Sequence, residues 1–232
     1  KELDDEIILK ELPKVIFILR NHITDLIDIR NYQQNKPNQN KNKNNIECNF
    51  EGNEFKGIIS YLKRTTNKNI HESGDLKITG GGTISASCPL HNIIKYDYDH
   101  INDYYFNSFK RAPNEGENWI EFDFCDRKIN VTSYTLRTGS NQACEDAHPK
   151  SWRIVGSNDR ENWKVINKQI DNDVLNGKYK QHHFECKKRK EFYRYIRYIQ
   201  DDSWFSKNEF KYKIKLTCIE FFGSVSRHNF LL

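Results

Sequence analysis

The segment from Ser151 to Trp163 constrains the fold more than any other part of the chain. Its pattern predicts a strand over Trp152–Val155, a Gly-Ser-Asn-Asp turn over residues 156–159, and a second strand that starts at Trp163. Glycine and Asx residues suit such a turn because they adopt left-handed backbone angles and hydrogen-bond their own backbone. Two Trp residues on either side of one turn are well placed to close the apolar end of a β-sandwich.

Four further segments have the composition of strands in a half-buried sheet. An apolar residue alternates with a charged one in the first, the second is rich in β-branched residues, and Arg alternates with aromatic or aliphatic residues in the third. The fourth is again aromatic and aliphatic. These segments are Trp119–Phe124, Val131–Arg137, Phe192–Tyr198 and Cys218–Gly223.

Together these segments resemble the discoidin or coagulation-factor 5/8 type C domain, an all-β, galactose-binding-like jelly roll. The matching motifs occur in the family's order, as Trp-Ile-x-Phe-Asp-Phe, Ser-Trp-x-Ile-x-Gly-Ser-Asn-Asp, Tyr-Arg-Tyr-Ile-Arg and Ile-Glu-Phe-Phe-Gly. The resemblance covers about residues 50–225 and is nearest to intracellular versions that follow BTB and BACK domains. In those versions His-x-Lys-Ser-Trp (here His148–Trp152) and Asn-Gly (here Asn176-Gly177) also recur.

The resemblance implies a jelly-roll β-sandwich over residues 48–225. A helical segment (1–30), an Asn/Lys/Gln-rich linker (31–47) and a short tail (226–232) complete the predicted organisation. The residues that we expect to anchor the core are Trp119, Phe122, Trp152, Ile154, Trp163, Tyr195, Ile219 and Phe221.

The composition limits the classes of partner. A chain of 232 residues holds one domain of ordinary size and an appendage. Its mean hydropathy is −0.88, and aromatic residues (13%) can fill a core in place of scarce aliphatic ones. The net charge of +5 comes from 37 basic and 32 acidic residues, so nucleic-acid binding is not implied. No apolar run approaches the ~20 residues of a membrane span.

Residues 1–30 carry apolar side chains at three- and four-residue steps, which predicts one or two amphipathic helices bent at Pro13. Because two such helices cannot bury their apolar stripe alone, we expect Leu19, Ile23 and Ile27 to dock on a preceding domain or another chain. The chain begins with Lys1 and contains no Met, so we expect it to be a fragment or a processed piece.

Six cysteines are scattered without CxxC spacing, which favours free thiols in a reducing compartment over a disulfide framework. In secreted relatives a disulfide often ties the two ends of the domain. Cys48 could be its first partner, but no Cys follows Gly223. One glycosylation sequon, Asn130-Val131-Thr132, lies at the start of a predicted strand.

Asp97, Asp99 and Asp103 lie close together in one segment. Carboxylates at this spacing could bind a structural Ca²⁺, as the corresponding loop does in some relatives, and a solvated turn explains them equally well. No other cofactor is expected. A catalytic centre is not expected either, because the His residues are spread over different segments and Cys144 and His148 lack an accompanying oxyanion-forming turn.

Relatives bind their ligand with loops at one rim of the sandwich, whether that ligand is a sugar, a phospholipid head group or a protein. The matching segments here are 85–94, 104–116, 138–150 and 203–213. Their candidate contact residues are Tyr104, Tyr105, Phe109, Lys110, Arg111, Asn141, Gln142, His148, Trp204 and Phe205.

The sequence therefore predicts a non-catalytic adaptor module in the cytoplasm. It would bind a protein partner or take part in a large assembly, for example a cytoskeletal one. The alternative is a lectin-like module that binds carbohydrate or a phospholipid head group.

Overall fold

The computed structural model describes residues 45–66, 70, 73–81, 83–84, 90–96, 108–109, 118–139, 148–204 and 214–226. The chain divides into two compact units, residues 1–43 and 44–232, and the elements below belong to the second. They are β1 (Asn45–Cys48), α2 (Ile58–Thr66), β2 (Lys77–Gly80), β3 (Thr83–Ile84), η1 (Leu90–Ile94), β4 (Ser108–Phe109), β5 (Asn118–Asp123), β6 (Ile129–Thr138), β7 (Pro149–Ser157), β8 (Lys164–Gln169), β9 (Gln181–Glu185), β10 (Tyr195–Ser203) and β11 (Leu216–Ser226).

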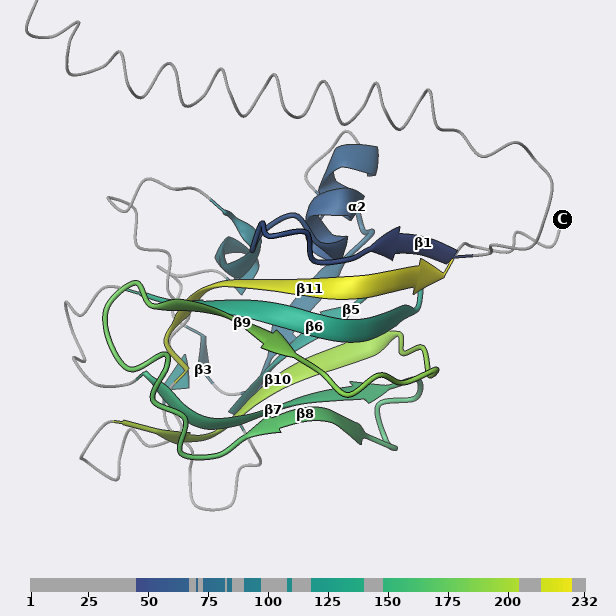
Figure 1. The fold of residues 1–232 in the computed structure, drawn as a ribbon. Coiled ribbons are helices and arrows are strands. Elements are labelled where there is room, and N and C mark those ends of the chain that lie inside the picture. Colours follow the sequence, from purple (N-terminus) through teal and green to yellow (C-terminus); the bar gives the residue numbers. More distant parts are fainter. Residues whose placement is uncertain are drawn as a thin grey trace, which may run out of the picture. The chain divides into compact units, whose positions relative to one another are not determined.

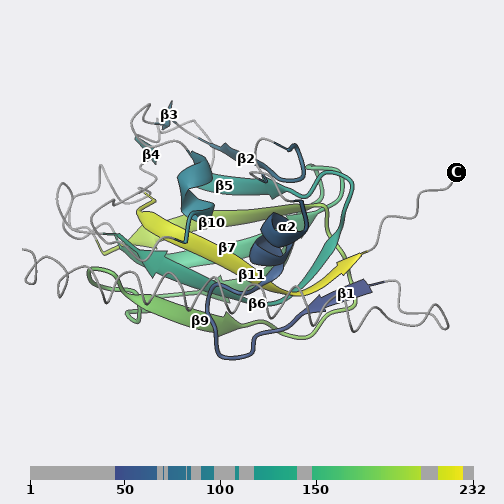
Figure 2. The same ribbon diagram turned by 90° about the horizontal axis from the view of Figure 1, so that it is seen from above.

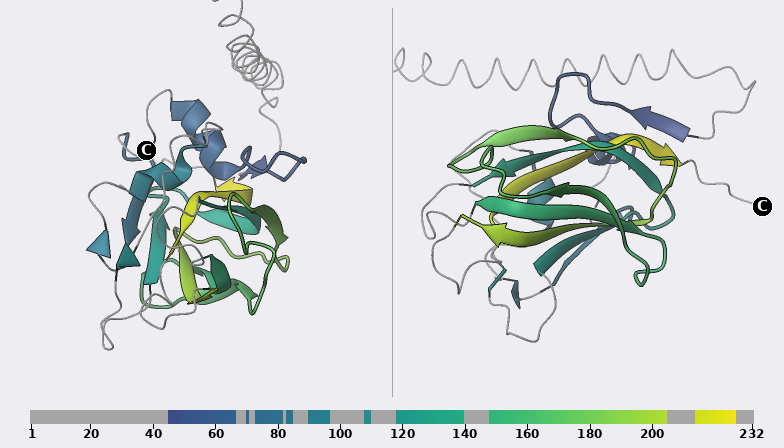
Figure 3. Two further views of the ribbon diagram at one scale, coloured as in Figure 1. Left: turned by 90° about the vertical axis from the view of Figure 1, so that its left-hand side faces the viewer. Right: turned by 60° about the horizontal axis from the view of Figure 1, so that its bottom comes forward.

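Two antiparallel sheets form a β-sandwich. One sheet has the strand order β1-β11-β6-β9, and the other has the order β2-β5-β10-β7-β8. Figures 1 and 3 show them as two packed layers, and the short pair β3-β4 stands apart from both. The predicted all-β sandwich is confirmed.

Aromatic side chains from both sheets fill the space between the layers. Trp152 of β7 is fully buried, and its indole N–H donates to the Tyr134 hydroxyl of β6 at 3.0 Å. The ring of Phe184 in β9 stacks on Tyr134 at 5.1 Å. Burying a Trp polar group in this way requires the partner that Tyr134 supplies. Five of the predicted anchors lie in this core, namely Phe122, Trp152, Ile154, Ile219 and Phe221.

The predicted strand at 192–198 was wrong at its start, because β10 begins at Tyr195. Tyr193 pairs instead with Ile129 as an isolated bridge, and the Arg194 N–H donates to the side chain of Asn158 at 3.1 Å. These contacts lead residues 192–194 toward the neighbouring loops and away from the strand pairing of β10. The alternation of Arg with aromatic residues in the sequence does not reveal that residues 193 and 194 pair outside β10.

Helix α2 and η1 lie over β11 (Figure 2). The first turn of α2 meets a buried carboxylate. The N–H groups of Ile59 and Ser60 donate to Glu220 of β11 at 2.9 and 3.0 Å, and the Ser60 hydroxyl donates at 2.8 Å. Because the first N–H groups of a helix have no partner within it, a carboxylate at this position satisfies them and complements the helix dipole.

The helix can approach β11 so closely only because residue 57 is glycine. A Cβ atom at Gly57 would lie 2.2 Å from the Phe221 carbonyl oxygen and 2.8 Å from Cγ of Glu220. On the other side, the Tyr96 hydroxyl donates to the Ile219 carbonyl at 2.8 Å. The residues of η1, which we predicted as part of a binding loop, therefore help to cover β11, with Leu90, Ile93 and Ile94 buried.

Glu220 gives a first test of this architecture. Burial raises the pKa of Glu220 above its ordinary value, although the hydrogen bonds from α2 and Phe221 act to lower it. In Glu220→Gln, an NH₂ group faces backbone N–H donors that now lack an acceptor, so the free energy of unfolding should fall by about 2–3 kcal/mol. Urea unfolding followed by Trp fluorescence measures the change.

The exposed Glu161→Gln is the matched control and should leave the unfolding free energy nearly unchanged. If the two variants unfold at the same urea concentration, the Glu220 carboxylate does not hold α2 on the sheet.

Candidate functional site

The strands that border the predicted rim segments 138–150 and 203–213 have their ends at one end of the sandwich, on the left in Figure 1. At this end β6 finishes at Thr138 and β11 starts at Leu216, and these two residues are paired. In the other sheet, Ser203 at the end of β10 is paired with Pro149 at the start of β7. Both sheets therefore contribute strand ends to one rim.

Buried hydrogen bonds fasten the β8–β9 loop, residues 170–180, to this rim. His148 is 1% exposed, and its Nδ1 accepts the Gly177 N–H at 3.1 Å. The Thr138 hydroxyl donates to the Gly177 carbonyl at 2.7 Å and accepts the Lys180 N–H at 2.9 Å. The backbone N–H of Trp204 donates to the His148 carbonyl at 3.0 Å. The predicted motif residues His148 and Gly177 thus form a rigid frame beneath the rim.

A cation, an aromatic ring and two carboxylates meet above this frame. The Lys150 ammonium lies 3.2 Å from Asp171, 3.5 Å from Asp202 and 5.3 Å from the centre of the Trp204 ring. The hydrogen bond to Asp171, followed by the charges of Asp171 and Asp202, raises the pKa of Lys150. Such a group keeps its charge at every physiological pH and can interact with a polar or aromatic ligand.

Of the ten predicted rim residues, the structure describes the side chains of His148 and Trp204. His148 is enclosed by the frame, Trp204 is partly exposed, and their contact with a ligand stays a prediction. Phe109 is placed in β4 without a described side chain. The other seven lie outside the described residues, and they are Tyr104, Tyr105, Lys110, Arg111, Asn141, Gln142 and Phe205.

The remaining predicted sites also lie outside the described residues. They are the candidate Ca²⁺ ligands Asp97, Asp99 and Asp103, and the docking residues Leu19, Ile23 and Ile27. Within the described part of the chain, no group of three or more His, Cys, Asp or Glu residues could hold a metal ion. The described helices include none that is long and apolar enough to cross a membrane.

The outer face of the five-stranded sheet carries a second, unpredicted arrangement. The Arg197 guanidinium of β10 lies between two indole rings, 3.9 Å from the centre of Trp119 and 4.1 Å from that of Trp163. Further along the same face, the guanidinium groups of Arg160 and Arg194 lie 4.2 and 4.9 Å from the centre of the Tyr195 ring. We call these six residues and the two carboxylates below them, Glu121 and Asp123, the arginine–aromatic face.

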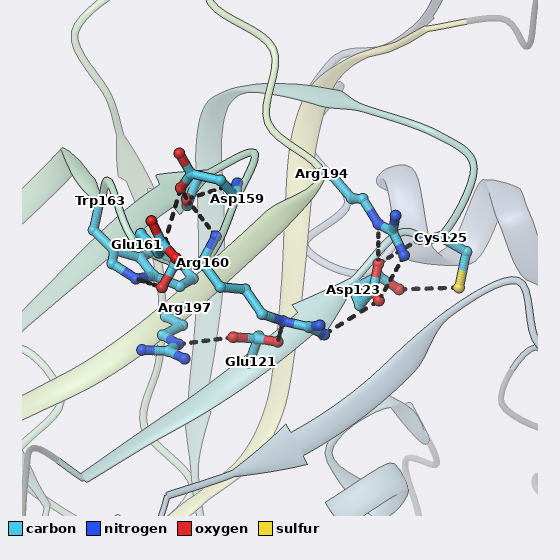
Figure 4. A network of polar contacts seen from close by, with 10 residues as sticks. Glu121, Asp123, Cys125, Asp159, Arg160, Glu161, Trp163, Arg194 and Arg197 are labelled. Carbon is cyan, nitrogen blue, oxygen red and sulfur yellow. Dashed lines mark hydrogen bonds and ion pairs between the residues drawn. The ribbon is translucent and has the colours of Figure 1, made fainter.

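Two buried carboxylates hold the arginines in place (Figure 4). Glu121 is 2% exposed and accepts hydrogen bonds from Nε of Arg160 and Nε of Arg197, both at 2.9 Å. Asp123 accepts from Nε of Arg194 at 2.7 Å and from Nη2 of Arg160 at 3.3 Å. Arg160 therefore bridges both carboxylates from the β7–β8 turn.

The neighbouring guanidinium groups of Arg194 and Arg160 favour the ionised form of Asp123. Burial acts to raise the pKa of Asp123, but the Arg194 hydrogen bond, the Cys125 N–H and the charges of Arg194 and Arg160 outweigh it. The pKa therefore lies below its ordinary value, and the carboxylate is ionised at neutral pH. An ionised Asp123 keeps two positive side chains, Arg160 and Arg194, together at the end of β5.

The turn that presents Arg160 is organised by Asp159. This carboxylate accepts the Asn162 N–H and side-chain amide, each at 2.8 Å, and the Glu161 N–H at 2.9 Å. The Asn162 side chain contributes most to lowering the pKa of Asp159. Arg160 has a left-handed backbone with φ of 65°, so these bonds hold a conformation that a non-glycine residue rarely adopts.

The prediction that Trp119 and Trp163 anchor the core was wrong, since both are only partly buried, whereas the predicted burial of Tyr195 is confirmed at 7% exposure. Residues alternate across a strand, so placing Ile120 and Phe122 inside puts Trp119 on the outer face. Trp163 packs against Arg197 on that face, and Tyr195 is buried on the same face beneath Arg160 and Arg194. The alternation of Trp119, Glu121 and Asp123 could have revealed the outer face, but the pairing with Arg160 depends on the folded turn.

Arg, Trp and Tyr are the residue types that contribute most to protein interfaces. Here they are fixed before any partner arrives, and the Arg160 and Arg194 side chains are 48% and 39% exposed. The rim and the outer face of the five-stranded sheet therefore both present preorganised polar and aromatic groups.

The model of the F5/8 type C domain family matches residues 95–210, which is half of the chain. The chain belongs to this family. The resemblance is thereby confirmed at the level of the F5/8 type C domain, and the relationship to versions that follow BTB and BACK domains stays a prediction. No curated protein sequence matches the chain.

Solved structures with a similar arrangement include parts of a putative chitobiase and of glycoside hydrolases. A fragment of a putative chitobiase from Bacteroides thetaiotaomicron is 12% identical, with a TM-score of 0.46, and the match covers 66% of this chain and 88% of that one. CBM32-3 from a family 31 glycoside hydrolase of Clostridium perfringens is 16% identical, with a TM-score of 0.46 and coverages of 65% and 92%. A family 89 glycoside hydrolase from the same organism is 16% identical, with a TM-score of 0.44. The match covers 64% of this chain and 14% of that enzyme.

Asp123 gives a test of the arginine–aromatic face. Because its folded pKa is lowered, its contribution to stability is present above about pH 4, the ordinary aspartate pKa, and is lost as the pH falls through the folded value. Asp123→Asn should lower the free energy of unfolding by about 1–3 kcal/mol at pH 7. The difference from the parent chain should shrink between pH 5 and pH 2.

Urea unfolding at a series of pH values provides the measurement, with the exposed Asp173→Asn as control. A difference at pH 7 that persists undiminished at pH 2 would show that the Asp123 charge does not stabilise this face.

Proposed function

We propose that this F5/8 type C domain is a non-catalytic adaptor module that binds a protein partner through its rim in a reducing, cytoplasmic compartment. The observation that carries the proposal is the rigid frame at the rim, with Lys150 and Trp204 held above it. Loops on a rigid scaffold are where binding residues concentrate in proteins. A preformed frame lowers the entropy lost on binding.

The free cysteines support the proposed location in a reducing compartment. Cys48, Cys125, Cys186 and Cys218 are all free, and three of them are buried. Burial raises the pKa of Cys48 and Cys186 to about 12 and that of Cys218 to about 11. Small secreted domains commonly use cysteine for disulfides, so a set of inert free thiols favours the cell interior.

The glycosylation sequon supports the same compartment. Asn130 is 6% exposed, and its amide nitrogen donates to the carbonyls of Arg189 at 3.0 Å and Glu191 at 2.7 Å. A glycan on that nitrogen would displace both hydrogen bonds. The folded domain therefore has no room for the modification that its sequence would allow in the secretory pathway.

One observation favours a second candidate, a carbohydrate-binding module. The Trp204 indole N–H is buried and has no hydrogen-bond partner among the described residues. A sugar hydroxyl could accept this N–H while the ring packs on the sugar, and Asp202 and Lys150 supply further polar contacts. The two candidates share the rim and differ in what binds there.

Site-specific photocrosslinking in the native cell separates the two candidates. A benzoylphenylalanine in place of the exposed Lys178, in the 170–180 loop, should crosslink the full chain to one protein. Adding Trp204→Ala should weaken that capture about tenfold or more, because truncating a buried interface Trp typically costs over 1 kcal/mol. The same crosslinker at Lys128, at the other end of the sandwich, is the control and should not capture that protein.

Glycan-array binding by the purified chain completes the comparison. A Trp204-dependent glycan signal without a protein crosslink would replace the adaptor function with the carbohydrate-binding one.

Thiol titration tests whether the domain resides in a reducing compartment. Protein purified from its native cells without reductant and then denatured should titrate six thiols. In the folded protein, Cys48, Cys186 and Cys218 should react only at the rate of unfolding, since their burial hinders the reactive thiolate. A count of four or fewer after denaturation would place the domain in an oxidising compartment.

A further inference from the structure

The outer face of the five-stranded sheet continues from the arginine–aromatic face to the edge strand β8. One row of directly paired residues crosses it, from Glu121 of β5 through Arg197 of β10 and Val155 of β7 to Val165 of β8. Paired residues on adjacent strands point to the same side of a sheet, so these four side chains share the outer face. Two strand spacings of about 4.8 Å place Arg197 and Val165 about 10 Å apart.

The Arg197 guanidinium has one edge that the described part of the protein does not use. The rings of Trp119 and Trp163 lie against its faces at 3.9 and 4.1 Å, and its Nε donates to Glu121 at 2.9 Å. Within the described residues, no hydrogen bond or ion pair involves its two terminal nitrogens, and Figure 4 shows them pointing away from Glu121. The side chain is 19% exposed. Two terminal nitrogens in one plane match the two oxygens of a carboxylate in bidentate geometry.

The charges of this face are layered. Glu121 and Asp123 are 2% and 3% exposed, and each accepts hydrogen bonds from two guanidinium groups. The three arginines are more exposed than these carboxylates. Exposed lysines, Lys77 on β2 and Lys168 on β8, pair with outer-face residues on the two edge strands of the sheet. Because the acids lie beneath the cations, the face directs positive charge toward solvent.

Acidic side chains on and beside this face do not cancel that charge. Arg153 pairs with Asp201 through Nε and Nη2, at 2.9 and 2.8 Å, and Asp159 is committed to the hydrogen bonds of its own turn. The exposed Glu161 in the same turn is an opposing charge. Three arginines over two buried carboxylates leave one positive charge, and the two lysines add two. A positive excess therefore remains after Glu161 is counted.

We propose that this face binds an extended segment of a partner protein in which a carboxylate lies three residues from an aliphatic side chain. The carboxylate pairs with the terminal nitrogens of Arg197, and the aliphatic group packs on Val165, which is 41% exposed. An extended chain advances about 3.3 Å per residue, so three residues span the distance of about 10 Å between these two side chains.

The surroundings of Arg197 favour such a ligand. The indole rings exclude water from both faces of the guanidinium, and an ion pair is stronger where water is excluded. Glu121 and the rings hold the guanidinium in one orientation, which lowers the entropy lost on binding. Arg and Trp are also the residue types that contribute most to protein interfaces.

The site shares no residue with the rim. The rim frame and the pair of Lys150 and Trp204 lie at the strand ends, whereas the row from Arg197 to Val165 crosses the sheet. The proposal therefore does not depend on the proposed function, and each site can be altered without the other.

Heteronuclear NMR of the isotope-labelled full chain tests the proposal. The probe is the peptide acetyl-Leu-Ser-Ser-Glu-Ser-Ser-Leu-amide, in which either Leu lies three residues from the Glu. At millimolar concentration it should shift the indole N–H signals of Trp119 and Trp163 and the Nε–H signal of Arg197, and leave the indole signal of Trp204 unchanged. Replacing its Glu by Gln should weaken binding about tenfold or more, because the charge and one oxygen are lost.

Arg197→Lys separates binding from a merely structural role. The variant keeps the charge but has a single ammonium in place of the planar fork. It should weaken binding of the Glu peptide about tenfold and of the Gln peptide less than about twofold, because the two changes remove the same interaction. Equal weakening of both peptides would show that Arg197 acts only through the fold. The urea midpoint confirms that the variant is folded.

Val165→Glu provides a second variant at an exposed position. Its charge repels the peptide carboxylate and its side chain removes the aliphatic contact, so binding should weaken about tenfold. Ile170→Glu is the matched control, because Ile170 is also exposed and lies about 16 Å further along the chain, beyond the Debye length. It should leave peptide binding within about twofold of the parent, as should Trp204→Ala at the rim.

Three results would overturn the proposal. The first is a set of unchanged Trp119, Trp163 and Arg197 signals at millimolar peptide, and the second is equal loss of binding in Val165→Glu and Ile170→Glu. The third is binding of a peptide with phosphoserine in place of Glu when the Glu peptide does not bind. That result would make this face a phosphate site instead.

Discussion

The ionised carboxylate of Asp123 holds one end of this sandwich together. It lies 3% exposed at the end of β5, where it accepts hydrogen bonds from Arg194, Arg160 and the Cys125 N–H. Each donor belongs to a different loop, so one buried charge sets the relative positions of all three. Glu121 repeats the arrangement one step further along the strand. Two buried acids would be costly alone, and the guanidinium groups compensate for their lost hydration.

A different buried interaction holds α2 against β11. The buried carboxyl group of Glu220 contacts the first turn of α2, and Gly57 gives the helix the space to approach. The rim at the far end is braced by neutral hydrogen bonds from His148 and Thr138. These interactions share no residue, so a change at one end need not disturb the other.

Strand pattern and motif order predicted the sandwich, because alternation reports directly which residues face the core. Phe122, Trp152 and Ile154 were predicted correctly on that basis. Trp163 was not, since its place depends on Arg197, which lies on another strand and outweighs its hydrophobicity. The contact between Glu220 and α2 joins residues 160 positions apart and has no local signature. The row from Arg197 to Val165 likewise has no local signature, because it joins residues of three strands.

The central claim is that the ionised carboxylate of Asp123 fixes three loops at one end of this F5/8 type C domain, independently of the rim. Hydrogen–deuterium exchange of the parent chain and of Asp123→Asn at neutral pH tests it most directly. The account predicts faster exchange in residues 186–194 and in the adjoining turn at 124–128 of the variant, with no change in the rim loop at 170–180. Unchanged exchange in residues 186–194 of a folded variant would contradict the account.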